Sequence, residues 1–264
     1  MTTLRFVQVD AFADRPFTGN PAAVMPLDDW LDDATLQSIA AENNLAETAF
    51  LVPWPATDAD YELRWFTPLI EVALCGHATL ASGHVLLSDD PARDAVRFAT
   101  RKSGVLEVRR AKAGYALDLP ALPAAPRDLP DIVRLIGGDP IATLWRDGGY
   151  VVLVYPDEQM VRALRPDFAT LARGENLLIV ATARGADHDI VSRAFAPAAG
   201  IDEDPVTGTA HALATPYWAE QLGRARITAY QASSRGGELV CELAGDRVIL
   251  EGNCVTVIDG CFRP

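Results

Sequence analysis

The segment Arg64-Trp-Phe-Thr-Pro68 decides the fold of this chain, because a close copy of it returns as Arg193-Ala-Phe-Ala-Pro197. Further segments repeat in the same order, with offsets that drift by only a few residues: Asn44-Leu45 as Asn176-Leu177, Gly76-His-Ala-Thr79 as Gly208-Thr-Ala-His211, and Ser103-Gly-Val-Leu-Glu-Val108 as Arg235-Gly-Gly-Glu-Leu-Val240. Repetition in a fixed order indicates an internal duplication. We therefore expect two domains of similar topology.

A proline-rich segment from Leu119 to Pro130, with four prolines, lies between the two copies. Proline fixes φ and lacks a backbone N–H, so this composition favours an extended connection over a helix or a central strand. The alternative is a loop inside one domain. We predict an N-terminal domain over residues 1–118, a linker over 119–130, a C-terminal domain over 131–254, and a tail, 255–264, that crosses back to the N-terminal domain.

Each copy reads as strand, turn, strand, helix, strand, strand, helix and two strands. In the first copy we expect strands at 4–12, 47–52 and 61–66, a turn at 18–21, and helices at about 33–43 and from Gly76 through Leu87. Asp32 or Asp33 suits the N-cap of the first helix. The second helix is apolar on most sides, which is typical of a buried helix. We predict an α+β fold in which each domain is a curved, mostly antiparallel, barrel-like sheet around a central helix.

Composition limits the possible partners. The chain has 264 residues, of which 49% are hydrophobic and 22% charged, and its formal net charge is −13. The negative charge argues against a nucleic-acid partner. No apolar run approaches the roughly 20 residues that span a bilayer, and the first residues lack a secretory-signal layout. We expect a cytoplasmic protein whose partner is a small anionic substrate, with no nucleic-acid or membrane partner.

Motifs for cofactors are missing from the sequence. There is no glycine-rich phosphate loop and no dinucleotide fingerprint. His77 and His84 are seven residues apart, without a carboxylate that completes a recognised metal pattern. The four cysteines, Cys75, Cys241, Cys254 and Cys261, are too widely spaced for a CxxC motif and are interpreted as free thiols. We therefore expect acid–base chemistry with no cofactor and no metal.

Glu47 is the first candidate for that chemistry. It stands in Asn44-Leu-Ala-Glu47-Thr-Ala-Phe50, where a predicted helix ends and an apolar strand begins. Apolar surroundings disfavour the charged form of a carboxyl group, which suits a general base for a weak carbon acid. The alternative is a glutamate on an edge strand that points to water.

Two predicted helix N-termini supply further candidates. Gly76 and His77 open the first apolar helix, where a ligand can approach the glycine backbone and exposed N–H groups can bind an anion. His77 can relay a proton, or it can simply bond to backbone near the helix start. Asp204, Gly208 and Thr209 stand at the matching helix of the second copy. The acids there could also be surface charge that stabilises the helix dipole.

These residues together resemble the phenazine-biosynthesis-F family. The resemblance covers nearly the whole chain and rests on Val9-Asp-Ala-Phe12, Gly19-Asn-Pro21, Asn44-Leu-Ala-Glu-Thr48, Arg64-Trp-Phe-Thr-Pro68, Cys75-Gly-His-Ala-Thr79, Phe195-Ala-Pro197 and Glu203-Asp-Pro-Val-Thr-Gly-Thr-Ala210. It implies a fold like that of diaminopimelate epimerase, an active site in an interdomain cleft and a homodimer. The implied activity is an isomerisation that moves a proton between carbons without a cofactor.

The resemblance also implies roles for individual residues. Glu47, His77, Asp204 and Thr209 correspond to catalytic positions, and Thr209 replaces a serine of the phenazine enzyme but keeps its hydroxyl. Asn20, Gly76 and Gly208 are expected to bind substrate. Cys75 is a second departure, at a position that is not cysteine in the phenazine enzyme. Two alternatives remain: a cysteine-dependent racemase that uses Cys75, and a metabolite-binding protein without turnover.

Overall fold

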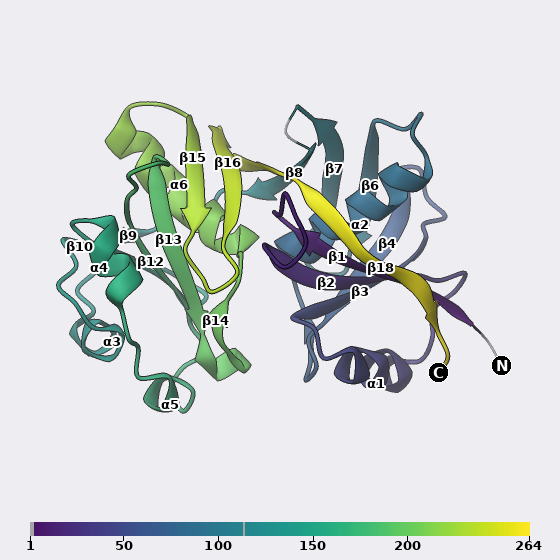
Figure 1. Ribbon diagram of the computed structural model, residues 1–264, viewed down its shortest axis with the longest axis horizontal. Helices are drawn as coiled ribbons and strands as arrows, with labels where there is room; N and C mark the ends of the chain where they lie inside the picture. The colour runs from purple at the N-terminus through teal and green to yellow at the C-terminus, as the bar shows by residue number, and fades with distance from the viewer. Residues whose placement is uncertain (1–2, 113) are drawn as a thin grey trace. The chain divides into compact units, whose positions relative to one another are not determined.

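The computed structural model describes residues 3–112 and 114–264, and it divides into two compact units. Unit 1 comprises residues 1–118 and 251–264, and unit 2 comprises residues 119–250. Met1, Thr2 and Ala113, which the domain prediction includes, lie outside the described residues. Figure 1 shows the elements of both units. Among the described helices, none is both long and apolar enough to cross a membrane.

Unit 1 contains two helices and a mixed sheet. Its elements are β1 (Leu4–Ala11), β2 (Asn20–Pro26), α1 (Asp33–Asn43), β3 (Glu47–Pro53), β4 (Tyr61–Phe66), β5 (Glu71–Val72), α2 (Gly76–Asp89), β6 (Ala95–Thr100), β7 (Val105–Ala111), β8 (Gly114–Pro120) and β18 (Cys254–Phe262).

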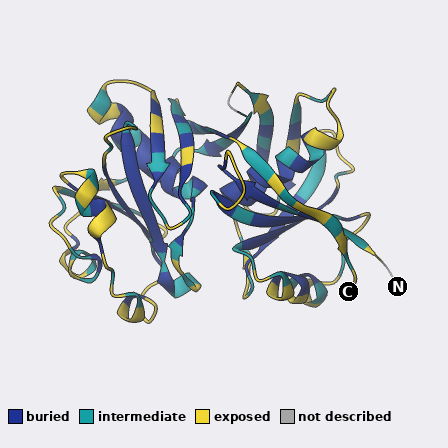
Figure 2. Ribbon diagram, viewed as in Figure 1, coloured by how far each residue is buried: buried dark blue, intermediate teal, exposed yellow. Residues whose placement is uncertain are grey.

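The strands of unit 1 curl around α2. Neighbouring strands pair antiparallel, except for the parallel pairs β2–β3 and β4–β6. The last strand, β18, pairs antiparallel with β1, and Figure 1 shows this yellow strand beside the purple one. Helix α2 packs against β1, β2, β3, β6 and β7, and most of its residues are buried (Figure 2). The apolar character of this helix therefore follows from its central position.

Local signals set the ends of α1. The side chain of Asp32 accepts a hydrogen bond from the backbone N–H of Thr35, which satisfies one of the free donors of the first turn. At the other end Asn44 adopts the left-handed conformation with φ of 48°. Asparagine tolerates this region better than most residues. The left-handed turn ends the helix three residues before Glu47 and directs the chain into β3.

Unit 2 repeats this plan around α6. Its elements are β9 (Ala125–Pro126), α3 (Pro130–Ile136), β10 (Ala142–Arg146), β11 (Tyr150–Val154), α4 (Glu158–Ala163), α5 (Phe168–Leu171), β12 (Leu178–Arg184), β13 (Ile190–Ala196), the 3-10 helix η1 (Pro197–Ala199), β14 (Ile201–Asp204), α6 (Gly208–Leu222), β15 (Arg226–Gln231), β16 (Gly237–Ala244) and β17 (Arg247–Gly252).

Strand pairing in unit 2 follows unit 1 step by step. The pairs β10–β11 and β12–β13 are antiparallel, as are β1–β2 and β3–β4. The parallel pairs β11–β12 and β13–β15 match β2–β3 and β4–β6. The short helices α4 and α5 stand where unit 1 has α1. The predicted α+β class, with two similar units around central helices, is confirmed.

The two arginines of the repeated segments, Arg64–Pro68 and Arg193–Pro197, have the same structural role in each unit. Arg64 in β4 is buried and makes two hydrogen bonds of 2.8 Å to the Glu71 carboxylate. Arg193 in β13 is bound by Glu203 in the same way, at 2.8 and 2.9 Å. Each guanidinium also lies over a phenylalanine two residues further on. A buried arginine needs such pairing to offset its desolvation, so each copy keeps both the cation and its acid.

Three details of the sequence prediction were wrong. Three strands follow each central helix rather than two: β6, β7 and β8 in unit 1, and β15, β16 and β17 in unit 2. The two-residue strand β5 is too short to give an alternating pattern. The turn predicted at 18–21 ends at Gly19, because Asn20 and Pro21 already pair with Ala11 and Asp10.

Candidate functional site

Glu47 is the first residue of β3, where the parallel pairing with β2 places it opposite Ala22. Its side chain is buried, with a residue exposure of 8%. Asn20, two residues before Ala22, is the first residue of β2 and is fully buried. The starts of the two strands therefore bring a carboxylate and an amide to the same end of the sheet.

His77 is the second residue of α2 and is also buried. Cys75 precedes the helix in an extended conformation, and this N-cap residue makes no side-chain capping hydrogen bond. The start of α2 thus has the character of helix starts that bind anions in other proteins.

The imidazole of His77 lies between the two strand starts and Cys75. Its Nε2 is 3.1 Å from Glu47 Oε2. The pair misses hydrogen-bond alignment, and neither atom has another hydrogen-bond partner in the described part of the chain. On the other side of the ring, Nδ1 lies 3.1 Å from Asn20 Nδ2 and 3.5 Å from Cys75 Sγ. The sheet and the helix start therefore bring Asn20, Glu47, Cys75 and His77 together.

Burial acts in opposite directions on the pKa values of His77 and Cys75. Burial by itself would lower the pKa of His77, but Cys75 and the neighbouring Glu47 raise that pKa well above 6.5. The Glu47 carboxylate is the cause that acts at neutral pH, because burial raises the pKa of the Cys75 thiol to about 11. The Cys75 thiol is therefore uncharged at neutral pH, while Glu47 favours the charged form of the His77 ring.

In unit 2, Asp204 ends β14 and is buried. Its carboxylate accepts a hydrogen bond from the hydroxyl of Thr207, the residue that precedes α6. The side-chain amide of Gln231 accepts from the Thr207 N–H at 2.8 Å and donates to the Asp204 carbonyl at 2.7 Å. Gly208 opens the helix, and Thr209 next to it is half-buried. This network fixes the α6 start, and the N-cap residue Thr207 makes no side-chain capping bond of its own to the helix.

His211 is held as a structural histidine. Its Nδ1 lies 2.9 Å from the Thr207 carbonyl, so Nδ1 carries the proton and donates it. Nε2 then accepts from Ser192 Oγ at 3.3 Å. Burial lowers the pKa of His211 to about 4, so the ring is neutral at neutral pH.

Sequence reasoning missed two contributions to these clusters. Asn20 was predicted to bind substrate, and the motif Gly19-Asn-Pro21 gives no sign that its side chain also contacts His77. Gln231 was not a candidate, because an isolated glutamine in a strand carries no local signal. Pairing β15 with β13 and β16 positions its side chain near the α6 start.

Comparisons with known proteins agree on one family. The PhzC-PhzF family, described as phenazine biosynthesis-like protein, matches residues 9–260. An uncharacterized isomerase of Pseudomonas aeruginosa is 49% identical over 97% of this chain and 98% of its own. A crystal structure of a phenazine biosynthesis PhzF family protein of Enterococcus faecalis covers 100% of both chains with a TM-score of 0.90 and 39% identity. A hydroxyproline epimerase from Agrobacterium vitis, at 12% identity, shares the fold with a TM-score of 0.66 over 98% of this chain and 92% of its own.

Proposed function

Because this chain belongs to the family of phenazine biosynthesis-like proteins, we propose that it is an isomerase that moves a proton on a small carboxylated metabolite. Glu47 is the general acid and base of this proposal, and no cofactor takes part. The relative from Pseudomonas aeruginosa that is named an isomerase supports the reaction class. The residue assignment rests on the geometry around Glu47.

The observation that carries the assignment is the state of the Glu47 carboxylate. Oε2 is buried, faces the His77 ring at 3.1 Å and has no hydrogen-bond partner among the described residues. Most buried carboxylates in proteins are fully bonded to cations or N–H groups. A carboxylate oxygen that the protein leaves unbonded can accept a proton from a substrate carbon and return it to another carbon or to the other face. The substrate loses one proton and regains one, so its oxidation state does not change and no oxidant is needed.

His77 supports this chemistry electrostatically. Against the effect of burial, Glu47 raises the pKa of His77 and favours the charged form of the ring, which in turn stabilises the carboxylate form that acts as base. When Glu47 takes a proton, this stabilisation is lost, which favours return of the proton to the substrate.

The substrate carboxylate is expected at a helix N-terminus. The first turn of α2 begins at Gly76, and its N-cap residue makes no side-chain capping bond, so N–H groups of this turn can bind an anion. The start of α6 is also proposed to contribute to the substrate site, through Asp204, Gly208 and Thr209. Substitution of Asp204 by Asn tests this point.

A homodimer and a cytoplasmic location are further parts of the proposal. Sedimentation measures the oligomeric state, and cell fractionation measures the location.

A cysteine-dependent racemase is less well supported. Such an enzyme needs a thiolate, whereas burial raises the pKa of Cys75 to about 11. It also needs a second thiol, but the residue before α6 that matches Cys75 is Thr207. We therefore expect Cys75→Ala to keep most of the activity.

The decisive test is Glu47→Gln, which keeps the shape of the side chain but cannot accept a proton. A panel of small cyclic and hydroxy carboxylic acids is incubated with the protein in heavy water, and isomer formation and deuterium uptake are followed by NMR. We expect the wild-type protein to convert at least one acid and Glu47→Gln to be slower by about 10²-fold or more.

The exposed Glu42→Gln is the matched control and should behave as wild type. Isomer formation is the primary readout, because a shielded Glu47 can return the same proton and leave the product without deuterium. Near-normal turnover by Glu47→Gln would refute the role of Glu47. Acids that bind but are never converted would point to the metabolite-binding alternative.

A further inference from the structure

The side chains around His77 combine three kinds of metal ligand. Glu47, Cys75 and His77 offer a carboxylate oxygen, a sulfur and an imidazole nitrogen, and these atoms all lie within 4.8 Å of one another. All three side chains are buried. Two of the atoms, Glu47 Oε2 and His77 Nε2, have no hydrogen-bond partner within the described residues. Buried polar atoms without partners point to a ligand that is able to bind them.

We propose that Glu47, Cys75 and His77 form a binding site for a thiophilic divalent cation such as Zn²⁺, which inhibits the protein when it binds. The donor set of sulfur, nitrogen and oxygen is one that Zn²⁺ prefers, and three protein ligands leave a fourth position for water. This goes beyond the proposed function, in which Glu47 works without a metal.

The local chain makes the site compact. Cys75 and His77 flank Gly76 at the start of α2, and Cys75 Sγ lies 3.5 Å from His77 Nδ1. Glu47 approaches the other ring nitrogen, Nε2, at 3.1 Å from β3. Only one ring nitrogen can bind the metal, so metal binding requires the side chain of Glu47 or of Cys75 to turn toward the nitrogen that the other residue contacts. Asn20, next to Nδ1, can accept or donate a hydrogen bond and so supports the ring when the metal is bound.

The proton balance of binding is simple. The Cys75 S–H bond breaks, its proton goes to solvent, and the sulfur electron pair forms the bond to the metal. The imidazole likewise gives up one proton so that a ring nitrogen can bind. No electron is transferred. The cation then occupies the lone pair of Glu47 that the proposed reaction needs, which is why binding and catalysis exclude each other.

The test uses Co²⁺ as a spectroscopic substitute for Zn²⁺ on the full chain without substrate. Titration should produce a sulfur-to-cobalt charge-transfer band, which Zn²⁺ removes by competition. In Cys75→Ser the band should be lost, and the dissociation constant for Zn²⁺, measured by calorimetry, should rise at least about 10-fold. In Glu47→Gln the band should remain but Zn²⁺ should bind more weakly, because the sulfur is kept and the carboxylate is lost.

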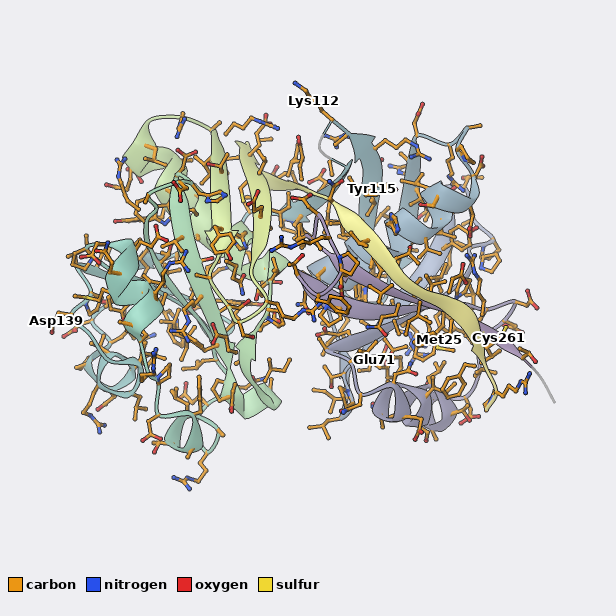
Figure 3. All side chains as sticks on the ribbon, in the orientation of Figure 1. Met25, Glu71, Lys112, Tyr115, Asp139 and Cys261 are labelled. Atoms are coloured by element: carbon orange, nitrogen blue, oxygen red, sulfur yellow. The ribbon has the colours of Figure 1, made fainter. Side chains whose placement is uncertain are left out.

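Two cysteines provide matched controls. Cys241 is buried in β16, and Cys261 is exposed on β18, where Figure 3 labels it. Cys241→Ala and Cys261→Ala should keep the band and the affinity. If the band persists in Cys75→Ser and disappears in Cys261→Ala, cobalt binds at the surface and the proposed site is wrong. The proposed site is also wrong if the wild-type protein shows no band. Circular dichroism checks that Cys75→Ser is folded, and if it is not, the Glu47→Gln titration decides.

Inhibition separates this inference from the proposed function. Zn²⁺ should inhibit isomer formation by the wild-type protein, and Cys75→Ala should need at least 10-fold more Zn²⁺ for the same inhibition. If no acid is converted by any form of the protein, the proposed function fails while the cobalt titration still tests the metal site. If Glu47→Gln is inactive in metal-free buffer and no form binds cobalt through Cys75, only the metal site fails.

Discussion

At His77 the two ring nitrogens have different kinds of neighbour. Nε2 faces a carboxylate, and Nδ1 faces the side-chain amide of Asn20 at 3.1 Å. An amide carries both a donor and an acceptor, so Asn20 can bond to Nδ1 whether or not that nitrogen carries a proton. Asn20 can thus hold the ring in place in either protonation state, and we expect it to be a positioning residue for His77 in the proposed reaction.

Substitutions at Asn20 should test its roles as a hydrogen-bond donor and as a hydrogen-bond acceptor. We expect Asn20→Leu to lower kcat by about 10-fold or more with little change in KM, because Nδ1 then keeps only the weakly accepting sulfur of Cys75 as a partner when it is charged. Asn20→Asp should keep the ring in place but raise the pKa of His77 further, because an added carboxylate favours the charged form. Its pH profile of turnover should shift to higher pH. Identical pH profiles for both variants and the wild-type protein would contradict the positioning role.

Among the elements, α2 shows how tightly the central helix is enclosed. A Cβ on Gly83 would lie 2.3 Å from Cγ1 and 2.5 Å from Cβ of Val108 in β7. Glycine normally weakens a helix interior by about 1 kcal/mol relative to alanine. Here it is retained because helix and strand approach too closely for any side chain. The close approach in turn fixes the start of α2, where His77 lies.

Gly83→Ala should therefore destabilise the protein despite its better helix propensity. Since the Val108 Cβ cannot move by a change of rotamer, we expect a net loss of about 1–3 kcal/mol in the free energy of unfolding, measured with urea. Val108→Ala removes the nearest methyl group and relieves part of the overlap. The loss caused by Gly83→Ala should consequently be smaller in the Val108→Ala background. Additive effects of the two substitutions would mean that the overlap is relieved elsewhere.

The same elements show what a sequence can and cannot predict. The ends of α1 were readable because Asp32 and Asn44 act through neighbouring backbone groups. The central helices were readable from their apolar composition and from the duplication. The contact of Asn20 with His77 joins residues 57 positions apart, and it depends on how β2 pairs with β3 and packs on α2. Such contacts are set by the tertiary fold and leave no local pattern, which is also why Gln231 was missed.

At the scale of the whole molecule, both ends of the described chain belong to unit 1. His84 on α2 joins the central helix to β8 and to the last strand, because its Nδ1 lies 3.1 Å from the Tyr115 hydroxyl of β8 and its Nε2 lies 2.9 Å from Thr256 Oγ1 of β18; Tyr115 is labelled in Figure 3. Arg5 of β1 adds ion pairs to Asp89 and to Asp259 of β18. The last strand is therefore attached to both the central helix and the first strand.

This attachment should weaken in acid. Burial lowers the pKa of His84 below 6.5, although Asp89 opposes the shift. The unfolded chain thus binds the proton first, and stability present above pH 6.5 is lost as the pH falls toward the folded-state pKa. We expect the unfolding free energy to fall between pH 7.5 and pH 5.5 by more in the wild-type protein than in His84→Gln. His211 has a lowered pKa as well, so the difference between the two proteins is the quantity to measure.

The pairing of β18 with β1 affects the order in which the two units complete their folding during synthesis. A ribosome makes β1 before unit 2 and β18 after it, so unit 1 starts to fold before unit 2 but is completed after it. Until β18 is made, β1 has an open edge on one side, and such edges pair readily with other chains. A chain that stops before β18 leaves Glu47 and His77 in a unit that lacks its closing strand.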